Sequence, residues 1–226
     1  MSEDGLTALE GSRLRASERC CELFIARGTT DISIAEIADA VGISQRSFYR
    51  YFPIKAESVG PMFDATIRAS NAMITGAGPD APLLEVLVQA FHTTLFEDAR
   101  VRTRAILPLV FEDPEMWSVF IRKLHDGERS VAPILAPRLG VPVDSLQART
   151  AAAAVASALR IALEVMVTSG GDPAAVYAEA LDAFAAGPLR PRDDRAEALT
   201  GAASKTRVPT GTEVDHGWQT AGRNEK

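Results

Sequence analysis

The stretch Ile32–Lys55, with the sequence ISIAEIADAVGISQRSFYRYFPIK, predicts two short helices joined by a tight turn. Ser33 and Glu36 have the spacing of a capping box that starts the first helix, and a glycine ends it. Ser44 can cap the second helix, which ends before Pro53 because the residue preceding a proline disfavours helical geometry. The second helix is rich in hydroxyl, amide, arginine and tyrosine side chains. Such a pair is typical of a helix-turn-helix motif that reads DNA.

The second helix has an apolar face and a polar face. Phe48 and Phe52 lie four positions apart, so we expect them to anchor this helix on the preceding ones. The opposite face begins with Gln45 and Arg46, which can form bidentate contacts with adenine and guanine in the major groove. Hydroxyl and basic side chains beside them suit contacts with phosphates. The predicted DNA-binding residues are Ser33, Ser44, Gln45, Arg46, Ser47, Tyr49, Arg50, Tyr51 and Lys55.

Charge is distributed unevenly along the chain. The formal net charge is −6, but residues 12–55 hold seven basic and five acidic side chains, a balance of +2 that leaves −8 elsewhere. This distribution argues against a general nucleic-acid coat and favours site-specific binding by a small surface. The alternative is a three-helix packing module with a solvated polar face. The absence of acidic residues from Val41 to Lys55 favours DNA binding instead.

A longer run of residues around this stretch has a distinctive spacing. It comprises Leu23-Phe24, Gly28, Ile37-Ala38, Val41-Gly42-Ile43-Ser44, Phe48-Tyr49-Arg50-Tyr51-Phe52-Pro53 and Lys55. This run resembles the N-terminal domain of the TetR family of bacterial transcriptional regulators. The resemblance implies a homodimer with two recognition helices in successive major grooves of a palindromic operator, and repression that a small ligand relieves. By position, the residues it implies as DNA contacts are Ser33, Gln45, Arg46, Tyr49, Tyr51 and Lys55. The family often has histidine at position 51 and serine at position 54, so this chain departs from its pattern there.

The rest of the chain predicts further helices and no strand. We expect an all-α fold, with a three-helix DNA-binding domain at residues 12–55 and a six-helix ligand-binding and dimerisation domain at residues 56–187. Ser12 can cap the first helix, which leaves residues 1–11 as a flexible arm. Residues 188–226 are polar with few large apolar side chains, which predicts a disordered tail.

Prolines lie at or near the predicted starts of three helices. Asp113-Pro114 and Asp172-Pro173 each combine an N-cap residue with a proline at the first helical position, so we expect a helix to begin at each. Pro61 permits two interpretations. It either bends the helix that links the two domains, which would help to set the separation of the recognition helices, or it simply occupies the first turn of that helix.

The segment before the last predicted helix is apolar on most sides. Between Ala151 and Thr168 the only residues that are not apolar are Ser157, Arg160, Glu164 and Thr168, which form one stripe. A helix of this kind has to be buried on most sides, and a partner subunit can cover one of them. The alternative is a central helix inside a monomeric domain. The predicted dimer-interface residues are Ala152, Val155, Leu159, Leu163, Val176, Ala180 and Phe184.

Aromatic and large apolar residues on the central helices suit a mostly apolar cavity. Residues 100–187 loosely resemble a TetR subgroup that binds acyl-CoA-like or other lipophilic ligands. This resemblance implies a small lipophilic or amphipathic ligand, with Arg102, Arg104 or Arg122 meeting its phosphate or carboxylate. The predicted pocket residues are Phe63, Phe91, Leu95, Arg102, Phe111, Trp117, Phe120 and Met166.

Other functional classes find little support in the sequence. The three histidines are far apart, and no phosphate-binding glycine loop or nucleophile elbow occurs, so we expect no enzyme, metal site or cofactor. Adjacent Cys20 and Cys21 fit a reducing compartment, and neither a secretory signal nor a charge-free run of about 20 apolar residues is present. We therefore expect a cytoplasmic protein without a membrane partner. A regulator that is ligand-independent or controlled by a protein partner remains the alternative.

Overall fold

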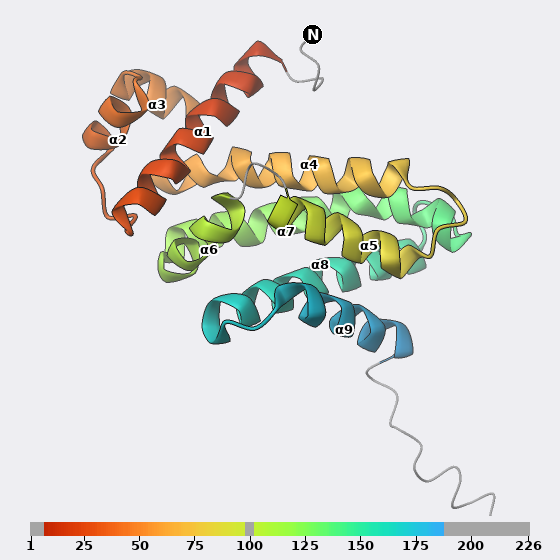
Figure 1. The fold of residues 1–226 in the computed structure, drawn as a ribbon. Helices are drawn as coiled ribbons and strands as arrows, with labels where there is room; N and C mark the ends of the chain where they lie inside the picture. The colour runs from red at the N-terminus through yellow and green to blue at the C-terminus, as the bar shows by residue number, and fades with distance from the viewer. Residues whose placement is uncertain (1–6, 98–101, 188–226) are drawn as a thin grey trace, which may run out of the picture. The chain divides into compact units, whose positions relative to one another are not determined.

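The computed structural model describes residues 7–97 and 102–187, and in this part of the chain it contains helices and no β-strand (Figure 1). The elements are α1 (Ala8–Arg27), α2 (Ile34–Val41), α3 (Gln45–Tyr51), the 3-10 segment η1 (Lys55–Val59), α4 (Gly60–Gly76), α5 (Leu83–His92), the π-helical segment η2 (Thr93–Glu97), α6 (Arg102–Glu112), α7 (Pro114–Leu139), α8 (Leu146–Ser169) and α9 (Pro173–Ala186). The all-α prediction is confirmed. The predicted tail at 188–226 lies outside the described residues.

Helices α1, α2 and α3 pack around a small apolar core. Phe24, Ile37, Phe48 and Phe52 are fully buried, and the ring centroids of Phe48 and Phe52 are 5.2 Å apart. Both phenylalanines thus anchor α3 on the two preceding helices, as their spacing predicts. Cys20 lies in the same core, where burial raises the pKa of its thiol to about 12. An uncharged, enclosed thiol fits a packing role.

Helix α1 begins earlier than the sequence analysis predicts. Thr7 is its N-cap, and the Thr7 hydroxyl accepts a hydrogen bond from the Glu10 backbone N–H while the Glu10 carboxylate accepts one from the Thr7 N–H. The Ser12 hydroxyl donates to the Ala8 carbonyl oxygen within the helix. Ser12 is therefore not a cap, and residues 8–11 of the expected arm are helical.

The prolines act as helix starters at three of the predicted positions. Pro114 and Pro173 occupy the first turns of α7 and α9, and Asp113 and Asp172 cap these helices through their side chains. Pro61 also lies in the first turn, that of α4, where a missing N–H removes no helical hydrogen bond. The predicted bend at this proline is wrong, and the alternative of a helix that starts there is confirmed.

The helices after η1 form a second layered group. Helix α7 packs against α4 on one side and α8 on another, while α5 lies between α4 and α9 (Figure 1). Helix α8 is long and apolar enough to cross a membrane by length and composition, but one such helix is weak support because the core helix of a soluble protein has the same properties. Only 28% of its most apolar window is buried within the chain. Most other residues of α8 are half-buried, so the helix keeps partly exposed apolar surface.

Candidate DNA-reading surface and ligand cavity

The N-terminal end of α3 presents the side chains that the sequence predicts for base contacts. Gln45 and Arg46 are exposed in the first turn, directly after the N-cap Ser44. The Ser44 hydroxyl accepts the Ser47 N–H at 3.1 Å and donates to the Ser47 hydroxyl oxygen at 3.0 Å. The cap therefore fixes the helix start, and the two longer side chains extend from a rigid end. The first turn of α3 contains no acidic residue.

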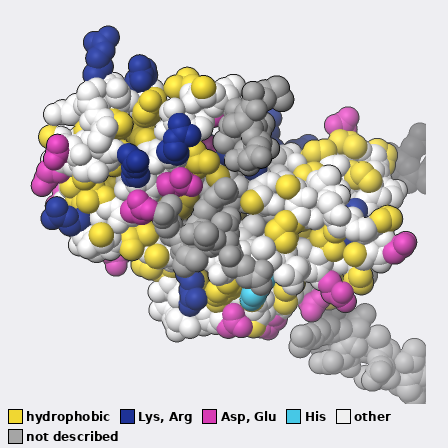
Figure 2. Space-filling view, turned by 45° about the horizontal axis from the view of Figure 1, so that its top comes forward, with side chains coloured by type: hydrophobic (Ala, Val, Ile, Leu, Met, Phe, Trp, Pro, Cys, Tyr) yellow, Lys and Arg dark blue, Asp and Glu magenta, His cyan; other side chains and the backbone are white. Residues whose placement is uncertain are grey.

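The rest of the outer face carries rings and positive charge. Tyr49 is 52% exposed, and Arg50 is exposed beside it. The Arg50 guanidinium lies over the ring of the half-buried Tyr51, 5.2 Å from its centroid. Figure 2 shows lysine and arginine side chains gathered mainly over the N-terminal helices, with acidic ones among them. This surface suits contact with a phosphate backbone.

Helix α2 begins with the predicted capping box. The Ser33 hydroxyl donates to Glu36 Oε2 at 2.7 Å and accepts the Glu36 N–H at 3.2 Å. These hydrogen bonds to Ser33 hold the pKa of the Glu36 carboxyl below its ordinary value of 4.5. The Ser33 hydroxyl thus orders the helix that supports α3, in addition to its predicted contact with DNA.

Replacing Ser33 with alanine is expected to destabilise the protein by about 1 kcal/mol at neutral pH, since the cap hydroxyl is lost. Because the folded pKa of Glu36 is lowered, its contribution is present above the unfolded value and disappears as the pH falls through the folded value. The difference between the two proteins should therefore shrink below about pH 4. Urea unfolding at pH 7 and pH 3.5 measures it, with Ser33→Thr as a control that keeps the cap. A difference independent of pH would contradict the capping-box account.

Lys55 is placed differently from its prediction as a phosphate contact. Its side chain is half-buried, and its Nζ donates a 2.8 Å hydrogen bond to the Thr30 carbonyl oxygen. The Thr30 hydroxyl in turn donates to Asp113 Oδ2 at 2.9 Å, at the N-cap of α7. The ammonium is therefore committed to the junction between the DNA-reading helices and α7. It does not lie on the exposed face of α3.

Two adjoining cavities lie among the helices that follow η1. Their volumes are about 90 Å³ and about 70 Å³, and most of their lining is apolar. The residues that line both cavities are Thr66, Ile67, Phe91, Thr94, Leu124 and Leu159, from α4, α5, η2, α7 and α8. The paired cavities have the mostly apolar character of a small-molecule site. We refer to them together as the sensor cavity.

Comparison with known proteins assigns the chain to a family. Residues 19–57 match the family of bacterial regulatory proteins of the tetR type, and residues 77–188 match the MftR C-terminal domain. The chain belongs to the TetR family. It is therefore a DNA-binding transcriptional regulator with a helix-turn-helix motif, and not an enzyme.

Curated TetR-family relatives match part of the chain. The HTH-type transcriptional regulator TcmR of Streptomyces glaucescens is 27% identical over 151 residues, which cover 60% of this chain and 64% of TcmR. The putative mycofactocin biosynthesis transcriptional regulator MftR of Mycobacterium tuberculosis is 25% identical over 138 residues, covering 60% of this chain and 70% of MftR. The match thus spans less than two thirds of the length of TcmR.

Solved structures of the TetR family share the fold. FadR of Thermus thermophilus, a repressor in complex with lauroyl-CoA, has a TM-score of 0.54 and 21% identity over 80% of this chain and 97% of its own. A regulator from Streptomyces coelicolor has a TM-score of 0.53 and 15% identity over 88% of this chain and all of its own. At these identities the likeness concerns the fold.

The predicted pocket residues divide into two groups. Phe63, Phe91, Leu95 and Phe120 line the sensor cavity. Phe111 and Trp117 do not line it and instead pack on each other, with ring centroids 4.5 Å apart. Met166 packs against the core outside the cavity lining, and the side chain of Arg102 lies outside the described residues. Arg104 stacks on Phe96, and Arg122 pairs with Glu57, so neither lines the cavity.

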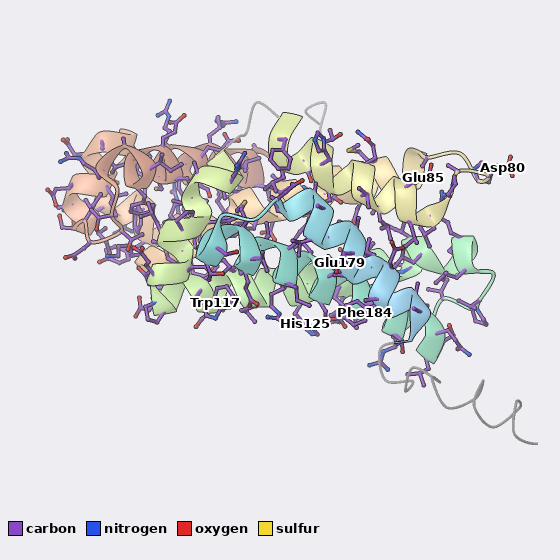
Figure 3. All side chains as sticks on the ribbon, turned by 60° about the horizontal axis from the view of Figure 1, so that its bottom comes forward. Asp80, Glu85, Trp117, His125, Glu179 and Phe184 are labelled. Atoms are coloured by element: carbon purple, nitrogen blue, oxygen red, sulfur yellow. The ribbon has the colours of Figure 1, made fainter. Side chains whose placement is uncertain are left out.

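The predicted dimer residues also separate by position. Ala152 and Leu163 are buried within the chain itself, and Leu159 lines the sensor cavity, so these three do not present a surface to a partner. Their placement follows from the side of α8 that faces α7 and the cavity. Val155 is half-buried and also lines the sensor cavity. Val176, Ala180 and Phe184 are half-buried, and Figure 3 shows Phe184 near the C-terminal end of α9.

The sensor cavity contains residues that the sequence analysis did not predict. Tyr177 of α9 lines it and is 2% exposed, with its ring stacked on Phe91 at a centroid distance of 4.5 Å. Lys123 of α7 also lines it, and its Nζ is 2.8 Å from Asp64 Oδ2 of α4. A tyrosine within an otherwise apolar helical face was the available sign for the first. The ion pair depends on the packing of two distant helices and has no local sign.

Proposed function

We propose that the protein is a homodimeric repressor whose two α3 helices enter successive major grooves of a palindromic operator, and that a small lipophilic or amphipathic ligand releases it. The observation that carries DNA recognition is the exposed start of α3, where Gln45 and Arg46 extend from a capped helix end. We propose residues 12–55 as the DNA-binding domain and residues 56–187 as the ligand-binding and dimerisation domain.

The surface of α8 supports dimerisation. This helix is mostly apolar, yet only 28% of its most apolar window is buried within the chain. Its polar stripe is internally paired, since Arg160 forms an ion pair with Glu164. A second copy of the chain that packs α8 and α9 against the same helices would remove this apolar surface from water, as in a four-helix bundle across a two-fold axis.

Two ion pairs connect the helix that lines the sensor cavity with the segments next to the DNA-reading helices. Lys123 lines the cavity and pairs with Asp64 near the start of α4. The neighbouring Arg122 pairs with Glu57 of η1, the segment that follows α3. A ligand that shifts α7 would therefore move the attachment of η1. Such a shift changes operator affinity only if the ligand binds the two arrangements with different affinities.

The family and the fold support this proposal in different ways. TetR-family regulators bind operators, and the FadR neighbour holds lauroyl-CoA, so the fold accommodates an amphipathic ligand. A DNA-binding regulator of this kind acts in the cytoplasm, where we place the protein. The alternative is a regulator that is ligand-independent or controlled by a protein partner, and it predicts a cavity that no small molecule fills.

The test combines sedimentation with DNA selection. We expect the purified chain to sediment as a dimer and to enrich a palindromic sequence from a random duplex pool. Lipophilic compounds that raise its melting temperature should release that duplex, because they bind one arrangement preferentially. Enrichment of palindromic DNA with no stabilising compound would favour the ligand-independent alternative. A monomer that enriches no sequence would contradict the proposal as a whole.

A further inference from the structure

Tyr177 is a buried polar residue of the sensor-cavity lining. The side chain is 2% exposed and lines the cavity, and burial raises the pKa of its hydroxyl. Within residues 7–97 and 102–187 this hydroxyl has no hydrogen-bond partner. The hydroxyl is not among the fully enclosed atoms that lack a partner, so it borders accessible space. A ligand that reaches it and supplies a hydrogen bond gains affinity at this point.

Two other polar side chains of the lining already have hydrogen-bond partners. Thr94 donates its hydroxyl to the Ala90 carbonyl oxygen at 2.8 Å, and Asn71 Nδ2 donates to Ser130 Oγ at 2.9 Å. The Thr94 hydrogen bond lies within its own helical segment, and the Asn71 hydrogen bond joins α4 to α7. The Ser70 hydroxyl also lines the cavity, but Ser70 is only half-buried. Tyr177 is therefore the buried residue of the lining whose hydroxyl has no partner among the described residues.

The lysine of the lining already has an anionic partner. Lys123 is paired with Asp64, with the Nζ and Oδ2 atoms 2.8 Å apart. Glu128 lies 3.7 Å from His125, measured between Oε2 and Nδ1, and this contact is ionic only while the histidine is protonated. In the described part of the lining no cation is left for a carboxylate or phosphate. An anionic ligand would have to displace Asp64 or approach Glu128, and either arrangement is electrostatically unfavourable.

The size and the walls of the cavity suit rings. Its two parts measure about 90 Å³ and about 70 Å³, each smaller than the apolar cavity of about 150 Å³ that holds benzene, so a ring compound has to occupy both parts. Phe91 stacks on Tyr177 at one wall, and Phe63 lies edge-on to Phe120 at another, with ring centroids 5.3 Å apart. Aromatic walls of this kind contact a ring compound closely.

We propose that the ligand of the sensor cavity is a compact, uncharged ring compound whose one polar group forms a hydrogen bond with the Tyr177 hydroxyl, an assignment that rests on the proposed ligand-gated function. Tyr177 is then the residue that selects among ligands of similar size. The apolar lining supplies affinity, and the lack of a free cation in the described lining disfavours anions.

Calorimetric titration with matched probes tests this assignment. Butylbenzene has no polar group, butyrophenone adds one uncharged acceptor, and 4-phenylbutyrate adds a carboxylate to a chain of similar size. Lauroyl-CoA provides an anionic amphiphile. Wild type is expected to bind butyrophenone roughly 3- to 10-fold more tightly than butylbenzene, the net effect of one neutral hydrogen bond, and to bind both anions more weakly. Tyr177→Phe should remove this preference without weakening the binding of butylbenzene.

Tyr49→Phe is the matched control, since it removes an exposed tyrosine hydroxyl from the DNA-reading face and should keep the preference. Tighter binding of either anion, no binding of the uncharged probes, or an unchanged preference in Tyr177→Phe would overturn the assignment. Because these titrations contain no DNA, their outcome is independent of operator binding. Loss of ligand-driven DNA release with intact probe selectivity would instead count against the proposed function.

Discussion

Arg46→Ala is expected to weaken operator binding by roughly 30- to 20,000-fold. A good bidentate contact between arginine and guanine contributes about 1–3 kcal/mol of discrimination, and the proposed dimer makes the contact twice. Every 1.4 kcal/mol corresponds to about tenfold in affinity. The exposed position of Arg46 in the first turn of α3 means that the change leaves no cavity in the core. The folded state should therefore keep its melting temperature.

The measurement is a fluorescence-anisotropy titration of the selected operator and of a random duplex, at fixed salt concentration. The affinity of the Arg46→Ala variant for random DNA should decrease far less than its affinity for the operator, because only a general electrostatic contact is removed. Arg129→Ala removes the same charge from the exposed surface of α7 and should leave the ratio of the two affinities unchanged. Equal losses on operator and random DNA would show that Arg46 contacts phosphates and reads no base.

The DNA-reading surface could be predicted from the sequence because its determinants are local. The capping box at Ser33, the cap at Ser44 and the spacing of Phe48 and Phe52 all act within a few residues. Local residue types alone predicted the wrong start for α1. Ser12 has the residue type of a cap, but the box that begins at Thr7 satisfies the N-terminal groups first.

The sensor cavity could be predicted only in part because it depends on packing between distant helices. Phe63 and Phe91 were identified as large apolar residues on central helices, and both line it. Phe111 and Trp117 have the same local character, yet they pack on each other. Tyr177 stands out as a tyrosine on an apolar helical face, but its place in the cavity depends on the packing of α9 against α5.

Phe48→Ala is expected to destabilise the protein by about 3–5 kcal/mol, the usual cost of removing a buried phenylalanine ring. Phe48 is fully buried in the core that joins α1, α2 and α3, and its ring lies 5.2 Å from that of Phe52. A loss of this size is a large share of the total stability of a typical domain, about 5–15 kcal/mol. Urea unfolding followed by circular dichroism measures it.

Tyr49→Ala gives the matched comparison, because Tyr49 is the next residue of α3 and is 52% exposed. It should change stability by less than about 0.5 kcal/mol while weakening DNA binding. Phe48→Leu retains most of the volume and should cost about 1.5 kcal/mol or less, which keeps the measurement possible if the alanine variant does not fold. The two neighbours thus separate the two faces of one short helix. If Phe48→Ala left stability unchanged, α3 would be held by contacts other than this core, and the exposed start of the helix could not be treated as a rigid reader of DNA.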